Sequence, residues 1–82
     1  MVSWFGWQPR DVKAEGNEAF KEKRPDAAIE LYSEGLEQLV GTAQTDKRAT
    51  LLSNRSAAYG VLQRWDEALS DADEACRLAP GK

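Results

Sequence analysis

An internal repeat constrains the fold more than any other feature of this sequence. Two stretches of the 82-residue chain match each other at a constant spacing of 40 residues. The matching positions are Val12 with Leu52, Ala28 with Ala68, Ile29 with Leu69, Ser33 with Asp73, Glu34 with Glu74 and Leu36 with Cys76. A chain of this length has room for one small domain, because single domains usually run from about 50 to 200 residues. The repeat therefore predicts one domain made of two similar halves.

Each half has the pattern of two helices. From Pro9 onward, apolar and small residues recur three and four positions apart, and no stretch alternates with period two, so no strand is expected. Proline at position 25 interrupts the first half, because it lacks an amide hydrogen and disfavours helical backbone in the residue before it. We expect helices at about 10–23, 26–39, 46–64 and 65–78. The two repeats are assigned to 9–40 and 49–82, with a linker at 41–48 and an aromatic segment at 1–8.

Composition excludes several classes of function. The chain has 11 Lys and Arg against 14 Asp and Glu, and a net charge of -3 does not favour binding to nucleic acid. It has no His, so the commonest general base and metal ligand is absent, and we expect no enzyme, no metal and no cofactor. No apolar stretch approaches the roughly 20 residues that span a bilayer, so no membrane partner is expected. The single cysteine, Cys76, suits a reducing compartment, which predicts a cytoplasmic protein.

Charge is unevenly divided between the predicted helices. The first helices of the two halves together carry eight Lys and Arg against five Asp and Glu, whereas the second helices carry one Arg against nine Asp and Glu. If the first helices line one face, that face attracts an anionic partner despite the negative net charge. The alternative interpretation is that the acidic residues only cover two solvated faces.

The repeated helix-turn-helix unit, with small residues where helices touch, resembles the tetratricopeptide repeat. The resemblance covers residues 9–82, and Gly16 stands at one of the small contact positions. It implies an all-α fold of two repeats in a short right-handed superhelical stack, in which the first helix of each repeat lines a groove. Glu15 and Arg55 stand where the family usually has Leu, and Gly35 where it usually has Ala.

Two segments resemble one branch of that family more closely. Lys13-x-x-Gly16-Asn17 and Ser53-Asn54-Arg55-Ser56-Ala57-Ala58-Tyr59 are similar to the dicarboxylate-clamp domains of co-chaperones. The resemblance implies that Lys13, Asn17 and Asn54 bind the free carboxylate and the last Asp side chain of an acidic Glu-Glu-Val-Asp tail of a heat-shock protein 90 or 70 chaperone. Lysine and asparagine suit this ligand, because both offer N–H donors to carboxylates that only accept.

The rest of the expected groove comes from both repeats. We expect its lining to include Phe20, Lys21, Ala57 and Gly60. The family completes its clamp with a Lys and an Arg from a third repeat that has no counterpart in these 82 residues, so we expect the clamp to be incomplete.

A structural or self-association module is the alternative function. A further repeat would cover the outer face of the last helix, and without it we expect that face to form a homodimer. The residues expected on that face are Leu69, Ala72, Cys76 and Ala79. Cys76 is predicted to be buried as a small apolar side chain. Trp4, Phe5 and Trp7 are expected to cap the open side of the first repeat, with contact to a partner or to a membrane interface as the alternative.

Overall fold

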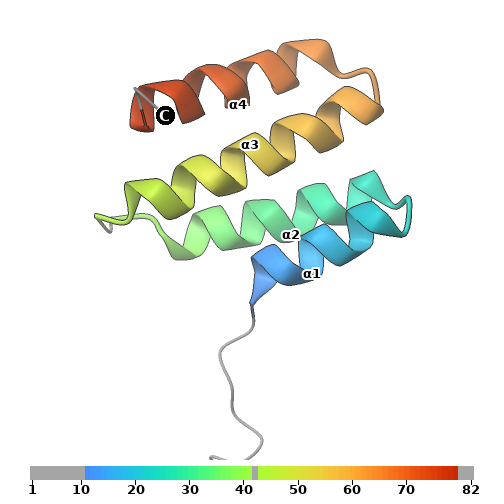
Figure 1. Cartoon of the computed structure of the whole chain (residues 1–82), viewed down its shortest axis with the longest axis horizontal. Coiled ribbons are helices and arrows are strands. Elements are labelled where there is room, and N and C mark those ends of the chain that lie inside the picture. The colour runs from blue at the N-terminus through green and yellow to red at the C-terminus, as the bar shows by residue number, and fades with distance from the viewer. Residues whose placement is uncertain (1–10, 42, 80–82) are drawn as a thin grey trace, which may run out of the picture.

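Four α-helices make up the described part of the chain. The computed structural model describes residues 11–41 and 43–79, and within these it contains no strand. The helices are α1 at Val12–Lys21, α2 at Pro25–Gln38, α3 at Thr45–Val61 and α4 at Trp65–Leu78 (Figure 1). The all-α prediction and the order of the four helices are confirmed. The predicted Trp4-Phe5-Trp7 cap lies outside the described residues.

The helices lie side by side in the order of the chain (Figure 1). α1 packs on α2, α2 on α3 and α3 on α4, and α1 also touches α3. Among the described helices, α4 contacts only α3. One side of the last helix is therefore not covered by any described element.

The turns inside the two hairpins have the same backbone structure. Lys23 and Gln63, 40 residues apart, have left-handed φ values of 65° and 62°. The amide groups of the next residues, Arg24 and Arg64, each donate to the carbonyl oxygen five residues earlier at 2.9 Å. This bond after a left-handed residue is the Schellman type of helix end. The repeat in the sequence is thus also a repeat of backbone geometry.

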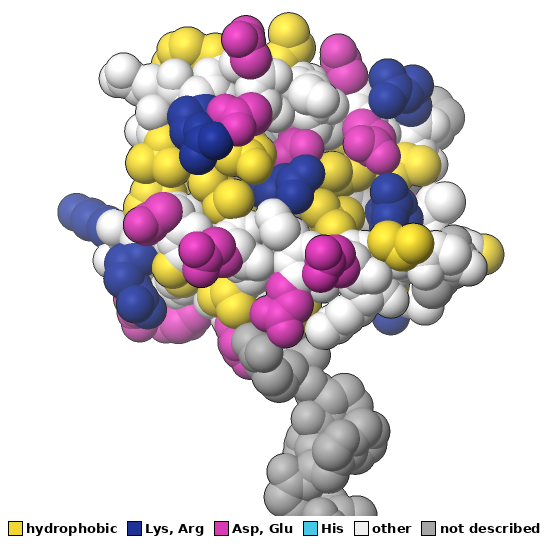
Figure 2. Space-filling view, turned by 180° about the vertical axis from the view of Figure 1, so that it is seen from behind, with side chains coloured by type: hydrophobic (Ala, Val, Ile, Leu, Met, Phe, Trp, Pro, Cys, Tyr) yellow, Lys and Arg dark blue, Asp and Glu magenta, His cyan; other side chains and the backbone are white. Residues whose placement is uncertain are grey.

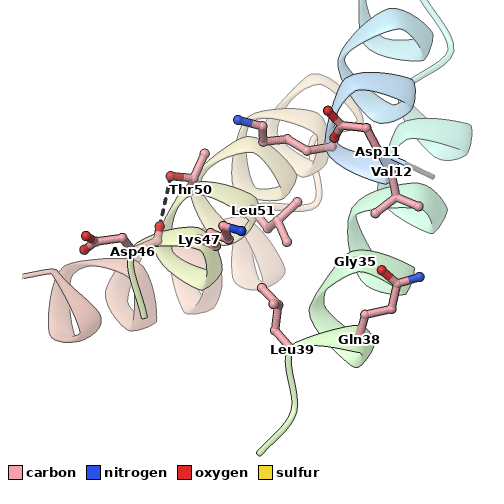
Figure 3. Close-up of a pocket in the computed structure, with 10 residues that line it drawn as sticks. Asp11, Val12, Gly35, Gln38, Leu39, Asp46, Lys47, Thr50 and Leu51 are labelled. Carbon is pink, nitrogen blue, oxygen red and sulfur yellow. Dashed lines mark hydrogen bonds between the residues drawn. The ribbon is translucent and has the colours of Figure 1, made fainter. Parts of the chain in front are cut away.

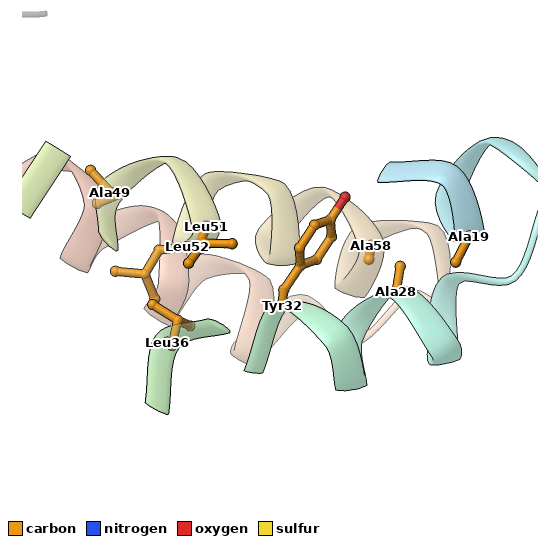
Figure 4. Close-up of a cluster of buried hydrophobic side chains, with 9 residues drawn as sticks. Ala19, Ala28, Tyr32, Leu36, Ala49, Leu51, Leu52 and Ala58 are labelled. Carbon is orange, nitrogen blue, oxygen red and sulfur yellow. The ribbon is translucent and has the colours of Figure 1, made fainter. Parts of the chain in front are cut away.

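The buried core lies along the seam between α2 and α3, with α1 and α4 closing it on either side (Figure 4). Its buried members are Ala19, Ala28, Tyr32, Leu36, Ala49, Leu51, Leu52, Ala58 and Ala75. Gly35 has no side chain because three helices meet there. A Cβ atom at Gly35 would lie 2.7 Å from Val12 Cγ2 and 3.1 Å from Leu51 Cδ1. The glycine therefore permits the close approach of α1 and α3 to α2.

An arginine side chain joins three of the helices. Arg55 of α3 donates through Nε and Nη2 to the carboxylate of Asp71 on α4, at 2.7 and 2.8 Å, and through Nη1 to Ser33 Oγ on α2, at 2.8 Å. Asp71 is 5% exposed, and the hydrogen bond to it raises the pKa of Arg55. Where the family usually has leucine, this chain therefore has a bidentate ion pair between helices.

The structure corrects the expected burial of Cys76. Its side chain is exposed, because α4 packs only on α3 among the described helices and Cys76 lies away from that contact. No helix in the described part of the chain is long and apolar enough to cross a bilayer.

Candidate functional site

Asn17 on α1 receives two hydrogen bonds from two other helices. Its Oδ1 atom accepts from the hydroxyl of Tyr32 on α2 at 2.5 Å and from Nδ2 of Asn54 on α3 at 3.3 Å. Tyr32 is buried, Asn54 is half-buried and Asn17 is exposed. With its oxygen occupied from the protein side, Asn17 offers the N–H groups of its amide to a ligand. The structure thus brings together the two asparagines that the sequence predicted for one site.

Gly16 makes this arrangement possible. A Cβ atom at Gly16 would lie 2.5 Å from Cε1 and 2.8 Å from Cδ1 of Tyr32, too close for any side chain. The tyrosine ring therefore packs directly against the backbone of α1, and its hydroxyl reaches the next residue, Asn17. This contact is the physical reason for a glycine followed by an asparagine in the motif.

The hydroxyl of Tyr32 stays protonated and can therefore always donate to Asn17. Burial raises the pKa of its hydroxyl, so the group is protonated at neutral pH. A protonated hydroxyl at 2.5 Å from Asn17 Oδ1 keeps the oxygen of that amide turned toward the protein. A tyrosine at helix-contact spacing is explained by the core alone, so the sequence pattern gives no sign of this second role.

Lys13 lies one helical turn before Asn17, on the same face of α1. It is exposed, and it borders a pocket of about 520 Å³ between α1, the end of α2 and the start of α3 (Figure 3). The apolar walls of the pocket include Val12, Leu39 and Leu51, and Lys47 of α3 contributes a second ammonium group to its lining. Sequence reasoning did not select Lys47, although its spacing of seven residues from Asn54 places both on one side of α3.

The positive charge available to a ligand is smaller than the sequence suggested. Three arginines form ion pairs with acidic residues of α4. Arg48 and Arg55 of α3 pair with Glu74 and Asp71, and Arg64, which directly precedes α4, pairs with Glu67. Positive and negative side chains are accordingly interspersed on the face turned away from the viewer in Figure 1 (Figure 2). Lys13 and Lys47 form no ion pair with any residue that the structure describes. Within the described residues, Lys13 and Lys47 are the unpaired cations at the pocket, while Lys21, Lys23 and Arg77 are exposed and unpaired elsewhere.

The four residues expected to line the groove do not border this pocket. Phe20 is half-buried against the core, while Lys21 and Ala57 are exposed. Gly60 is half-buried, and a Cβ atom there would lie 3.7 Å from the Trp65 ring, an ordinary contact distance. Within residues 11–41 and 43–79, no cluster of three or more acidic, His or Cys side chains is arranged to hold a metal ion.

Segments similar to this chain occur in larger proteins. The chain is 40% identical over 73 residues to tetratricopeptide repeat protein 4 of Homo sapiens, a match that covers 89% of this chain and 18% of that protein. The fold is a pair of tetratricopeptide repeats. The chain is also 39% identical over 70 residues to heat shock protein STI1 of Saccharomyces cerevisiae and 36% identical over 70 residues to Hsp70-Hsp90 organizing protein 2 of Arabidopsis thaliana. Each of these two matches covers 85% of this chain and 11% of the relative.

The tetratricopeptide pair is also similar to the mitochondrial import receptor subunit TOM70 of Homo sapiens, at 35% identity over 69 residues, which is 84% of this chain and 11% of that protein. The chain thus spans less than a fifth of the length of these curated relatives. No family model and no solved structure matches the chain.

Proposed function

We propose that this chain is a non-enzymatic adaptor that binds the acidic C-terminal tail of a heat-shock protein 90 or 70 chaperone through Lys13, Asn17 and Asn54. The observation that carries the proposal is the occupied oxygen of Asn17, which leaves amide N–H donors on an exposed surface one turn from an ammonium group. A terminal carboxylate accepts hydrogen bonds only, so it fits the N–H donors of Lys13, Asn17 and Asn54. Two of the similar proteins carry heat shock or Hsp70-Hsp90 in their names, which favours this class of partner.

The neighbouring pocket supports the same ligand. Lys47 adds a second cation to a lining that also holds the carboxylates of Asp11 and Asp46. Val12, Leu39 and Leu51 offer apolar surface for the valine of a Glu-Glu-Val-Asp tail. The cytoplasmic location stays a prediction, since one similar protein is a mitochondrial import receptor subunit.

Side-chain amide resonances test the proposal directly. Asn17 and Asn54 are the only asparagines in the sequence, so their amide groups give two assignable pairs of signals in a ¹⁵N-labelled sample. Titration with a peptide ending in Glu-Glu-Val-Asp should shift both pairs, while the amide of Gln63 in the second hairpin turn stays in place. Shifts at Gln63 without shifts at the asparagines would show that the tail binds elsewhere.

Self-association is the second candidate, and one observation favours it. Leu69 and Trp65 on α4 are 63% and 64% exposed, and a large apolar surface on a small protein favours association. Sedimentation equilibrium over a wide concentration range measures this. A dimer that dissociates on dilution would support the candidate, and a monomer at every concentration would reject it.

A further inference from the structure

The pocket beside the carboxylate site has room for a large apolar side chain. Its volume is about 520 Å³, within the range of roughly 300 to 1,000 Å³ that is usual for ligand pockets. Its apolar lining comes from three parts of the fold (Figure 3). These are Val12 of α1, Leu51 of α3 and Leu39, which directly follows α2. An apolar group that enters between them is removed from water on three sides.

The polar groups of the lining suit a tryptophan better than a phenylalanine. Lys13 and Lys47 are exposed and form no ion pair with a described residue. An ammonium group binds the face of an indole ring more strongly than the face of a phenyl ring. The indole N–H also needs an acceptor when the ring is buried. The carboxylate of Asp46 and the amide oxygen of Gln38, which both belong to the lining, are suitable acceptors.

A tryptophan of this chain lies within reach of the pocket. Asp11 borders the pocket, and its Oδ1 atom caps α1 by accepting from the amide of Ala14 at 3.1 Å. The point from which residues 1–10 lead away is therefore fixed at the rim of the pocket. Trp7 precedes Asp11 by four residues, and four residues span at most about 13 Å. The pocket can thus be reached without any change in the helices.

We propose that Trp7 occupies this pocket, with its ring between Leu39 and Leu51 and against the two lysines. The segment of the same chain is favoured over that of a second copy, because a connection of four residues gives a high effective concentration. Trp7 then covers the apolar surface that the proposed function gives to the valine of the acidic tail, so the two compete. The competition rests on the proposed function, whereas the docking of Trp7 does not.

Nuclear Overhauser effects in the full chain test the docking. The ring protons of Trp7 should give cross-peaks to the methyl groups of Leu39 and Leu51, and the ring current should shift those methyl signals. Trp7→Ala should remove both effects. Trp65→Ala, at a tryptophan of α4 that is 64% exposed, is the control and should leave the same methyl signals in place. Cross-peaks that arise only between labelled and unlabelled copies would place the segment on a second copy and overturn the proposal.

Calorimetric titration with a peptide ending in Glu-Glu-Val-Asp tests the competition. If the docked form outnumbers the open form about tenfold, Trp7→Ala should bind the peptide about tenfold more tightly than the parent, and Trp65→Ala should bind it as the parent does. Saturating peptide should also remove the cross-peaks between Trp7 and Leu39 in the parent.

The two measurements separate the docking from the function of the site. Absence of cross-peaks between Trp7 and the pocket in the free chain would overturn the proposal, and so would a Trp7→Ala variant that binds the peptide no more tightly than the parent. Cross-peaks from Trp7 in a chain that binds no peptide would support the docking and contradict the proposed function instead.

Discussion

Two lysines of the first hairpin give the clearest comparison at the scale of single residues. Lys13 and Lys23 are both exposed, but only Lys13 shares the face of α1 with Asn17. Lys13→Ala should weaken binding of the acidic tail by roughly 10 to 150-fold, because a charge-assisted hydrogen bond contributes about 1.5 to 3 kcal/mol. Isothermal titration calorimetry measures this, with Lys23→Ala as the control. Equal losses for the two variants would leave only general electrostatic attraction.

Tail binding should depend on the side-chain amide of Asn54. Asn54→Asp replaces the donor to Asn17 Oδ1 with a group that only accepts, and it also faces the carboxylates of the ligand. We expect tail binding to fall below detection while the helical circular dichroism spectrum and the midpoint of urea unfolding change little. A variant that binds like the parent would remove Asn54 from the site.

Tyr32→Phe separates the positioning of Asn17 from the packing of the ring. The phenylalanine ring keeps the contact with Gly16 but loses the hydrogen bond to Asn17. We expect unfolding free energy to fall by about 0.5 to 1.5 kcal/mol, and tail binding to weaken as well. Unchanged binding, measured under conditions where the variant is fully folded, would show that the tyrosine hydroxyl does not orient the asparagine.

The same tyrosine makes a prediction about alkaline pH. Burial raises the pKa of Tyr32 above its unfolded value, which is about 10, so the native state keeps a proton that the unfolded chain loses. This stabilisation is complete below the unfolded pKa and is lost as pH rises through the folded pKa. Urea unfolding should be measured from about pH 8 to pH 11, on both sides of the ordinary tyrosine pKa. The free energy of unfolding should fall less at alkaline pH in Tyr32→Phe than in the parent. The opposite order would contradict the burial argument.

Sequence reasoning found the asparagines of the site but not what holds them. Lys13, Asn17 and Asn54 were selected from a resemblance, and the structure places the two asparagines in hydrogen-bond contact. Tyr32 was missed because a tyrosine at helix-contact spacing is already explained by the core. Its hydroxyl lies on α2, 15 residues from Asn17, and no local pattern predicts a bond between helices.

At the scale of helices, the ion pair between Arg55 and Asp71 is the main difference from expectation. Asp71 is one of the nine acidic residues of the second helices, which the alternative interpretation of the charge pattern places on solvated faces, but it is 5% exposed and paired with Arg55 of α3. The helix pattern was predictable because prolines and apolar spacing are local signals. The end of α3 was not: it stops at Val61 because Gln63 adopts a left-handed turn without the glycine that usually signals one.

Removing one side of this pair should destabilise the whole stack. We expect Arg55→Ala to lower the unfolding free energy by about 3 kcal/mol, because Asp71 is left buried without its partner and Ser33 loses a hydrogen bond. Replacing Arg55 and Asp71 together by leucine should restore most of the loss. Urea denaturation measures both. Arg64→Ala, which breaks an exposed pair, is the control and should change stability little; an equal effect of Arg55→Ala and Arg64→Ala would contradict the account.

At the scale of the whole molecule, two repeats support two distinct faces. The side of α1 and α3 that holds Lys13, Asn17 and Asn54 offers donors, and the outer side of α4 offers apolar surface with exposed carboxylates. The first face was predicted from the sequence. For the second, the sequence placed both Leu69 and Cys76 on the outer face of the last helix but also predicted Cys76 to be buried, as its counterpart Leu36 is. Cys76 is exposed, because α4 contacts only α3 among the described helices.

The most direct measurement compares two forms of one peptide. If the carboxylate site binds the free end of an acidic tail, the charge of that end matters, so calorimetric titration should use a peptide ending in Glu-Glu-Val-Asp with either a free or an amidated terminus. We predict measurable binding of the free form and binding at least about tenfold weaker for the amidated form, since amidation removes the charge from one charge-assisted hydrogen bond. Equal affinities for the two forms would contradict the account.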